Sequence, residues 1–289
     1  MTQAPEIKIG ALTQWYGSNR EKTEAAGREL GKLDWCGVPF MGGLPELRLI
    51  QARSGVAADL HRHMVNLARV VRDPDLCAQA GALLDLTPFH EAEYRDCQER
   101  CRDREKPRFV LSDEASTIAP PDVRWAVDYF ISSWMGPGGS SGKSQEFTRY
   151  FSSRWSSSGG ASVTRFRSAV ESLLGWSRVL SRWEFRVMDA FAFINEVDDT
   201  EGHGLYCDPP WPKLGIEYKC RFSDEDQAKL EKKLRGFSKT RVVVRFGDHP
   251  LIRELYQPPH WRWVEFSTRN QANNEVAEVL IVNGPSLTA

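Results

Sequence analysis

Long apolar runs are missing from this chain of 289 residues. No stretch approaches the ~18 consecutive apolar residues that a membrane-spanning helix needs. The first ten residues, MTQAPEIKIG, have neither the basic start nor the long apolar core of a secretory signal peptide. We therefore expect a cytoplasmic protein that does not enter a membrane.

Cysteine is scarce, and its spacing contains no repeated CxxC pair. Six cysteines are spread between Cys36 and Cys220, and in a reducing compartment we expect them to stay free thiols. Cys97 and Cys101 would share one helical face, with His90 upstream, but no second pair of ligands accompanies them. The sequence therefore predicts neither a disulfide framework nor a metal site.

A charge bias is also missing, because the formal net charge is only −1. The segment from Lys143 to Arg186 departs from this balance, with eight basic residues against three acidic ones. It also contains three tryptophans and five other aromatic residues. Basic side chains among aromatic ones suit a phosphate backbone with stacked bases. A solvated helical face over core aromatics accounts for the same pattern, and both interpretations stay open here.

A phosphate-binding P-loop is missing too, although residues 136–144, GPGGSSGKS, approach one. Gly142-Lys143-Ser144 supplies the end of the motif, but Pro137 stands where its first glycine belongs. The preceding segment is predicted to be helical, whereas a P-loop follows a strand. We expect a flexible basic loop here.

What is present indicates an α/β protein. Apolar spacing and turn residues predict helices at 20–30, 46–53, 60–73, 89–109, 120–135, 170–183, 223–237 and 249–257. Short apolar runs predict strands at 33–38, 55–59, 184–189, 203–207, 240–246, 261–267 and 275–284. The opening order of strand, Gly-rich turn, helix and strand ending in an acid is typical of a doubly wound sheet.

Three groups of residues follow predicted strands. They are Phe40-Met41-Gly42-Gly43, then Asp59, and later Asp208-Pro209-Pro210-Trp211. In an open parallel sheet, ligands bind outside the carboxyl ends of the strands, and an acid ending the second strand commonly holds a ribose. This pattern predicts a nucleoside-cofactor site beside a rigid, aromatic-walled pocket. Asp59 as a helix cap, and Asp208 in a plain strand-ending turn, are the alternatives.

These motifs, in this order, resemble the Dam-type (alpha-class) DNA adenine-N6 methyltransferases, which use S-adenosyl-L-methionine. The similar segments are QWYGSNR (14–20), VPFMGG (38–43), ADLHRHMVNLARVVRD (58–73), YCDPPW (206–211) and VEFSTRNQANNEVAEVLIVNG (264–284). The resemblance implies a Rossmann-like doubly wound methyltransferase sheet formed by 1–85 and 161–289. It also implies an inserted, mainly helical target-recognition module at 86–160.

The resemblance further implies roles for individual residues, with double-stranded DNA as the partner. The catalytic residues would be Asp208, Pro209, Pro210 and Trp211. The cofactor-binding residues would be Trp15, Asn19, Pro39, Phe40, Gly42, Gly43, Asp59, Asp189 and Asp208. The DNA-binding residues would be Lys143, Arg149, Arg154 and Arg165.

Two positions depart from the family pattern. Gly17 is followed by Ser18 and Asn19, whereas the family usually has a lysine two residues after this glycine, and Val38 stands where many relatives have an acid. Losing one charge-assisted hydrogen bond to the cofactor would cost about 1.5–3 kcal/mol. The alternatives left open are a methyltransferase acting on RNA adenine or cytosine N4, and a degenerate DNA-binding homologue.

Overall fold

The computed structural model describes residues 9–16, 23–105, 119–148, 150–153, 161–212, 218–269 and 275–288. The described residues divide into two units. The first contains 9–16, 61–105, 119–148, 150–153 and 161–181, and the second contains 23–60, 182–212, 218–269 and 275–288. Within these ranges, no helix is both long enough and apolar enough to cross a bilayer.

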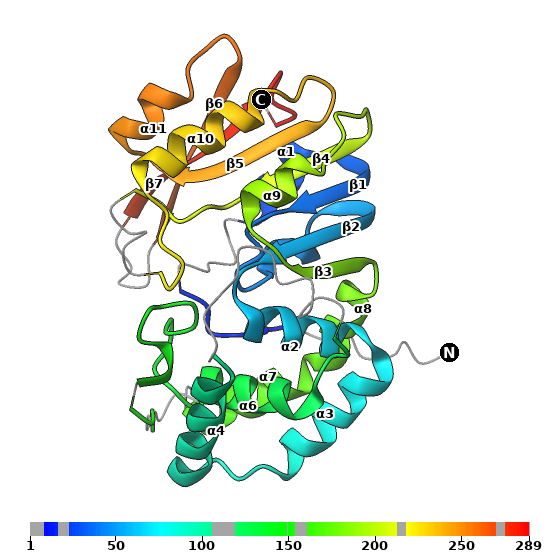
Figure 1. The fold of residues 1–289 in the computed structure, drawn as a ribbon, viewed down its shortest axis with the longest axis vertical. Helices are drawn as coiled ribbons and strands as arrows, with labels where there is room; N and C mark the ends of the chain where they lie inside the picture. Colours follow the sequence, from blue (N-terminus) through cyan, green and yellow to red (C-terminus); the bar gives the residue numbers. More distant parts are fainter. Residues whose placement is uncertain are drawn as a thin grey trace. The chain divides into compact units, whose positions relative to one another are not determined.

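The second unit is built on a seven-stranded mixed sheet in the described part of the chain. Its strands are β1 (Lys32–Val38), β2 (Gln51–Asp59), β3 (Trp183–Val187), β4 (His203–Cys207), β5 (Arg241–Gly247), β6 (Trp261–Arg269) and β7 (Glu275–Asn283). Their order is β3-β2-β1-β4-β5-β7-β6 (Figure 1). The first five run parallel, and β7 pairs antiparallel with both β5 and β6. The order reverses between β1 and β4, which makes that pair the switch point where doubly wound sheets bind ligands.

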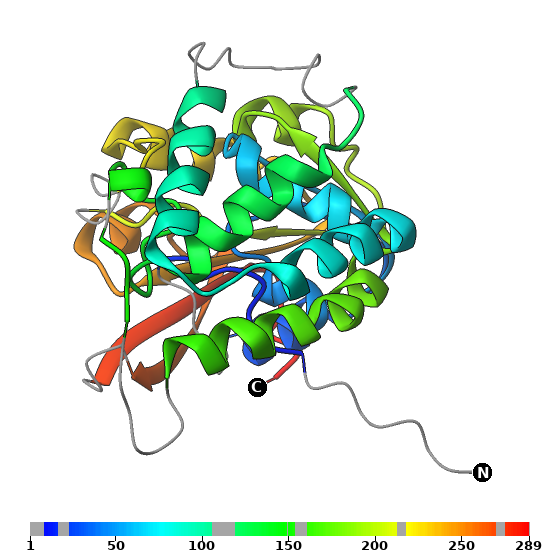
Figure 2. The same ribbon diagram turned by 90° about the horizontal axis from the view of Figure 1, so that it is seen from below.

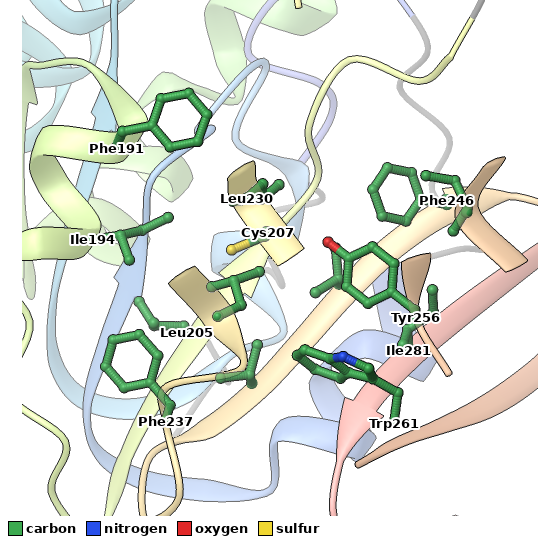
Figure 3. Close-up of a cluster of buried hydrophobic side chains, with 14 of the residues drawn as sticks. Phe191, Ile194, Leu205, Cys207, Leu230, Phe237, Phe246, Tyr256, Trp261 and Ile281 are labelled. Carbon is green, nitrogen blue, oxygen red and sulfur yellow. The ribbon is translucent and has the colours of Figure 1, made fainter. Parts of the chain in front are cut away.

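Helices cover both faces of this sheet. They are α1 (Thr23–Leu30), the 3-10 turn η1 (Pro45–Arg48), α9 (Ala190–Asn195), α10 (Asp224–Leu234) and α11 (Pro250–Leu255). Figure 3 shows one apolar layer, in which side chains of α9, α10 and α11 pack on those of β4, β5 and β7. Alternate residues of a strand point to opposite faces. Val242, Val244 and Phe246 of β5 join this layer, whereas Arg245 points to the other face, toward η1.

The first unit is helical, and its helices are coloured from blue-cyan to yellow-green in Figures 1 and 2. They are α2 (Arg62–Arg72), α3 (Pro74–Leu86), α4 (Glu91–Arg104), α6 (Val123–Trp134), η2 (Glu146–Thr148), α7 (Ser162–Glu171) and α8 (Leu173–Leu180). Buried aromatic side chains, among them Tyr129, Phe130 and Trp176, form its core. Asp73 and Asp122 accept hydrogen bonds from the first turns of α3 and α6, which fixes where these helices begin.

The expected α/β class is confirmed, and the predicted strands lie within a few residues of the observed ones. The helix predicted at 46–53 is wrong, because η1 ends at Arg48 and β2 begins at Gln51. Leu33 of β1 pairs with Ala52, so pairing along β1 overrides the local helical preference. Helices α3, α7 and α9 were not predicted. The methyltransferase arrangement and the insertion at 86–160 stay predictions.

Candidate functional site

The Asp208-Pro209-Pro210-Trp211 motif follows β4 directly, beside the switch point. Gly37 of β1 pairs with Leu205 of β4, and Val38 pairs with Ala57 of β2. Continuing these pairings to the strand ends puts Phe40 level with both Asp208 and Asp59. The three strand-end groups predicted to form a site therefore lie at one edge of the sheet, on three adjacent strands.

Contacts from β5 and α10 hold the motif in place. Arg245 Nη1 donates to Asp208 Oδ2 over 2.7 Å. The buried Gln227 donates through Nε2 to the Pro210 carbonyl, also over 2.7 Å. The Trp211 ring packs on Gly247 so closely that a Cβ there would lie 2.8 Å from it. Asp208 itself is 24% exposed. An acid and an aromatic ring are thus fixed at the surface of the second unit.

The turn after β1 is tied to the end of β2. The Gly42 amide donates to Asp59 Oδ2 over 3.1 Å, and the Met41 amide donates to the Ala58 carbonyl over 3.0 Å. Gly42 has a φ of 44° and Leu44 a φ of 67°, which is left-handed backbone that disfavours ordinary side chains. Such strain is characteristic of ligand-binding turns. Pro39 and Gly43 are buried in this turn, whereas Phe40 is half-buried.

Asp59 is not a helix cap, so that alternative is wrong. His61 occupies the cap of α2, and its Nδ1 accepts from the Met64 amide over 3.2 Å. Asp189 does cap a helix, since its Oδ1 accepts from the amides of Phe191 and Ala192 at the start of α9. The cofactor role of Asp189 stays a prediction.

Two aromatic residues connected to the predicted Phe40 by ring contacts were not themselves predicted. The rings of Phe40 and Phe222 meet edge to face with centroids 5.5 Å apart, and Phe222 stacks on Phe191 at 5.8 Å. Cys220 is close enough to Asp59 to respond to its charge. Burial and then the Asp59 charge raise the pKa of the Cys220 thiol to about 12. Nothing in the local sequence marks Phe191 and Phe222, since phenylalanine is common in any core.

Glu46 is another residue that sequence reasoning missed. It is buried in η1, with Oε1 3.9 Å from Arg245 Nη1. Burial and then the Asp208 charge raise its pKa to about 7, and the opposing effect of Arg245 does not offset them. A buried carboxyl of the turn after β1 thus responds to the charge of the motif after β4.

The remaining predicted residues belong to the first unit or lie outside the described residues. Trp15 packs against Gly142 and meets His61 edge to face, with ring centroids 5.1 Å apart. Lys143 Nζ lies 3.8 Å above the Tyr16 ring, and the exposed Arg165 lies 6.0 Å from the Trp134 ring. Asn19, Arg149 and Arg154 are outside the described residues.

The glycine-rich loop, Cys97 and Cys101 belong to the first unit. Helix α6 precedes residues 136–144, whereas a P-loop follows a strand. The structure therefore agrees that this segment is not a P-loop. All six cysteines are free thiols. Cys97 and Cys101 share a face of α4, where they contact Asp128 and Ser132 of α6. No group of three or more His, Cys, Asp or Glu side chains suited to a metal occurs among the described residues.

Comparison with known proteins adds no family to these observations. No protein-family model matches the chain, and no curated protein matches it either. The function is therefore inferred from the chemistry of the site itself.

Proposed function

We propose that the protein is a site-specific DNA methyltransferase, which transfers a methyl group from S-adenosyl-L-methionine to the N6 amine of an adenine in double-stranded DNA. One observation carries the proposal. The acid-Pro-Pro-Trp motif and the Phe40–Gly43 turn flank the switch point of a doubly wound sheet, at the level of Asp59. This is the edge at which such sheets bind nucleoside ligands.

The residues at this edge fit S-adenosyl-L-methionine. Asp59 ends the second strand and offers a carboxylate, which suits the two hydroxyls of a ribose. The neighbouring rings of Phe40 and Phe222 suit the flat face of a purine. The Gly42 turn brings backbone close to such a ligand without a side chain in between. When bound, this group supplies an electrophilic methyl on a sulfonium.

The motif suits an exocyclic amine as the acceptor. The amine of adenine is a weak nucleophile because its lone pair is delocalised into the ring. Asp208 and the Pro209 carbonyl are two acceptors for its two N–H groups, and a fixed carboxylate stabilises positive charge developing on the nitrogen. The prolines hold φ near −65°, which keeps these acceptors rigid.

The same motif suits a base that has left its duplex. Enzymes that modify a base inside DNA flip it into a pocket and stack it on an aromatic side chain. Trp211 is such a side chain, since Gly247 and Arg245 support its ring. Lys143 and Arg165 of the first unit are candidates for phosphate contacts. The antiparallel β6–β7 hairpin, where the closing hairpin of the family is expected, also supports the proposal.

The test uses purified protein, labelled S-adenosyl-L-methionine and duplex DNA of mixed sequence. We expect label in DNA from the wild type, and a loss of about 100-fold or more in Asp208→Ala. The matched control is Asp34→Ala, because Asp34 is an exposed acid on β1 of the same sheet. Undiminished transfer by Asp208→Ala would overturn the assignment.

Nucleoside analysis of the product identifies the acceptor. We expect N6-methyladenine in DNA, whereas N4-methylcytosine, or label in an RNA substrate alone, would replace the proposed acceptor with one of the alternatives.

A further inference from the structure

Arg245 is the centre of a buried charge cluster beneath the motif. Its side chain is 2% exposed, and it faces three carboxylates. Nη1 lies 2.7 Å from Asp208 Oδ2 and 3.9 Å from Glu46 Oε1, while Nε lies 3.1 Å from Glu278 Oε2 on β7. A buried guanidinium needs such partners, because its desolvation is otherwise very costly.

The three carboxylates of the cluster differ in solvent exposure, and the most exposed one belongs to the motif. The Glu278 side chain is fully buried and the Glu46 side chain is 10% exposed, whereas Asp208 is 24% exposed. Asp208 is thus the member of the cluster with the most solvent contact. Arg245 connects this accessible carboxylate to a carboxylate in the interior through two different nitrogens.

Arg245 also supports the aromatic side chain of the motif. Its Cζ lies 5.5 Å from the centroid of the Trp211 ring, within cation–π range. Because a guanidinium is planar and its donors diverge at fixed angles, holding Nε on Glu278 fixes where Nη1 points. One rigid plane therefore contacts both the acid and the ring of the motif.

We infer that Arg245 is the positioning residue for Asp208 and Trp211, an inference that builds on the proposed function. Arg245 does not touch the substrate. It holds Asp208 Oδ2, so that the carboxylate keeps one orientation toward the amine, and it supports the ring that receives the base. Oriented acceptors accelerate a reaction because their reorganisation is not repeated at each turnover.

The first experiment compares Arg245→Lys with Arg241→Lys. Lysine keeps the charge but has no planar fork, so it cannot hold Glu278, Asp208 and Trp211 together. We expect kcat to fall about 100-fold in Arg245→Lys, with the KM for S-adenosyl-L-methionine unchanged within about threefold.

Arg241 is the matched control because it lies on the same strand and pairs with the buried Glu29 over 2.8 Å. We expect Arg241→Lys to retain kcat. Retained kcat in Arg245→Lys, or equal losses in the two variants, would show a merely structural role and overturn the inference.

The second experiment does not depend on activity. It measures urea unfolding for Asp208→Asn, Arg245→Met and the double variant, all in a Glu278→Gln background that avoids a buried unpaired carboxylate. If Arg245 holds Asp208, the effects on the folding equilibrium constant should be non-additive by about tenfold. Additive effects would overturn the inference. If the variants show clear coupling but the wild-type protein transfers no methyl group, the proposed function is rejected and the contact between Arg245 and Asp208 stands.

Discussion

At the scale of the residue, Glu46 shows how one buried carboxyl links two loops. Asp208 faces it from the end of β4, Arg245 faces it from β5, and Arg48 lies on its own turn. Its pKa is raised from 4.5 to about 7, so the folded protein holds its proton through a range in which the unfolded chain has lost it. Stability from this group is therefore present below pH 4.5 and decreases as the pH rises to about 7.

Glu46→Gln should remove this dependence on pH. Glutamine carries no charge, so the variant should gain about 1–3 kcal/mol relative to the wild type between pH 5 and pH 8. Urea unfolding of both proteins at the two pH values measures the change. An equal difference at pH 5 and pH 8 would contradict the raised pKa.

Chemistry-bearing residues differ in how far the sequence predicts them. Asp59 and Asp208 were placed together correctly, because the ends of parallel strands share an edge of the sheet. Arg245 and Glu46 were not, since their neighbours come from β4, β7 and the turn after β1. An arginine within VVVRF reads as an exposed residue until strand order and facing are known.

At the scale of the element, glycines test how tightly each segment is packed. A Cβ on Gly55 of β2 would lie 2.3 Å from the Trp183 ring and 2.6 Å from the Cys36 carbonyl. In contrast, a Cβ on Gly81 of α3 would meet nothing within 4 Å. The same substitution should therefore have opposite effects in the two elements.

We expect Gly55→Ala to destabilise the protein by about 2–3 kcal/mol through overpacking. Gly81→Ala should stabilise it by about 0.5–1 kcal/mol, because alanine reduces the backbone entropy of the unfolded chain and favours helix. Thermal unfolding of the two variants beside the wild type provides the comparison. Destabilisation by Gly81→Ala would contradict the open surroundings of that residue.

Elements with strong local signals were the ones that the sequence predicted well. The strand predicted at 203–207 coincides with β4, since prolines end it. The helix predicted at 46–53 is wrong because its apolar residues are divided between a 3-10 turn and a strand. Leu47 packs in η1 while Ala52 belongs to a paired strand, and pairing depends on β1, which local periodicity does not contain.

At the scale of the whole molecule, the net charge is only −1, but basic residues exceed acidic ones in the segment from Lys143 to Arg186. Lys143 and Arg165 belong to the first unit, whereas the proposed catalytic residues belong to the second. If the first unit contacts phosphates, DNA affinity should depend on salt through these side chains.

Lys143→Ala should weaken binding to all duplex sequences alike and reduce the slope of log K against log salt by about 0.9. Lys232→Ala is the control, because Lys232 is an exposed lysine on α10 of the second unit. Fluorescence anisotropy with labelled duplexes at several salt concentrations measures both slopes. An unchanged slope in Lys143→Ala would remove this residue from the proposed interface.

The two faces of strand β5 differ in polarity, and this affects how the sheet assembles. Val242, Val244 and Phe246 enter the apolar layer, and Arg245 enters the opposite layer among carboxylates. A slip of β5 by one residue would invert every side chain, so it would drive a guanidinium into hydrocarbon and put a hydrophobic side chain in its place among the carboxylates. Mispaired arrangements of this strand are therefore much higher in free energy, and Arg245 also helps to fix the register in which β5 pairs with its neighbours.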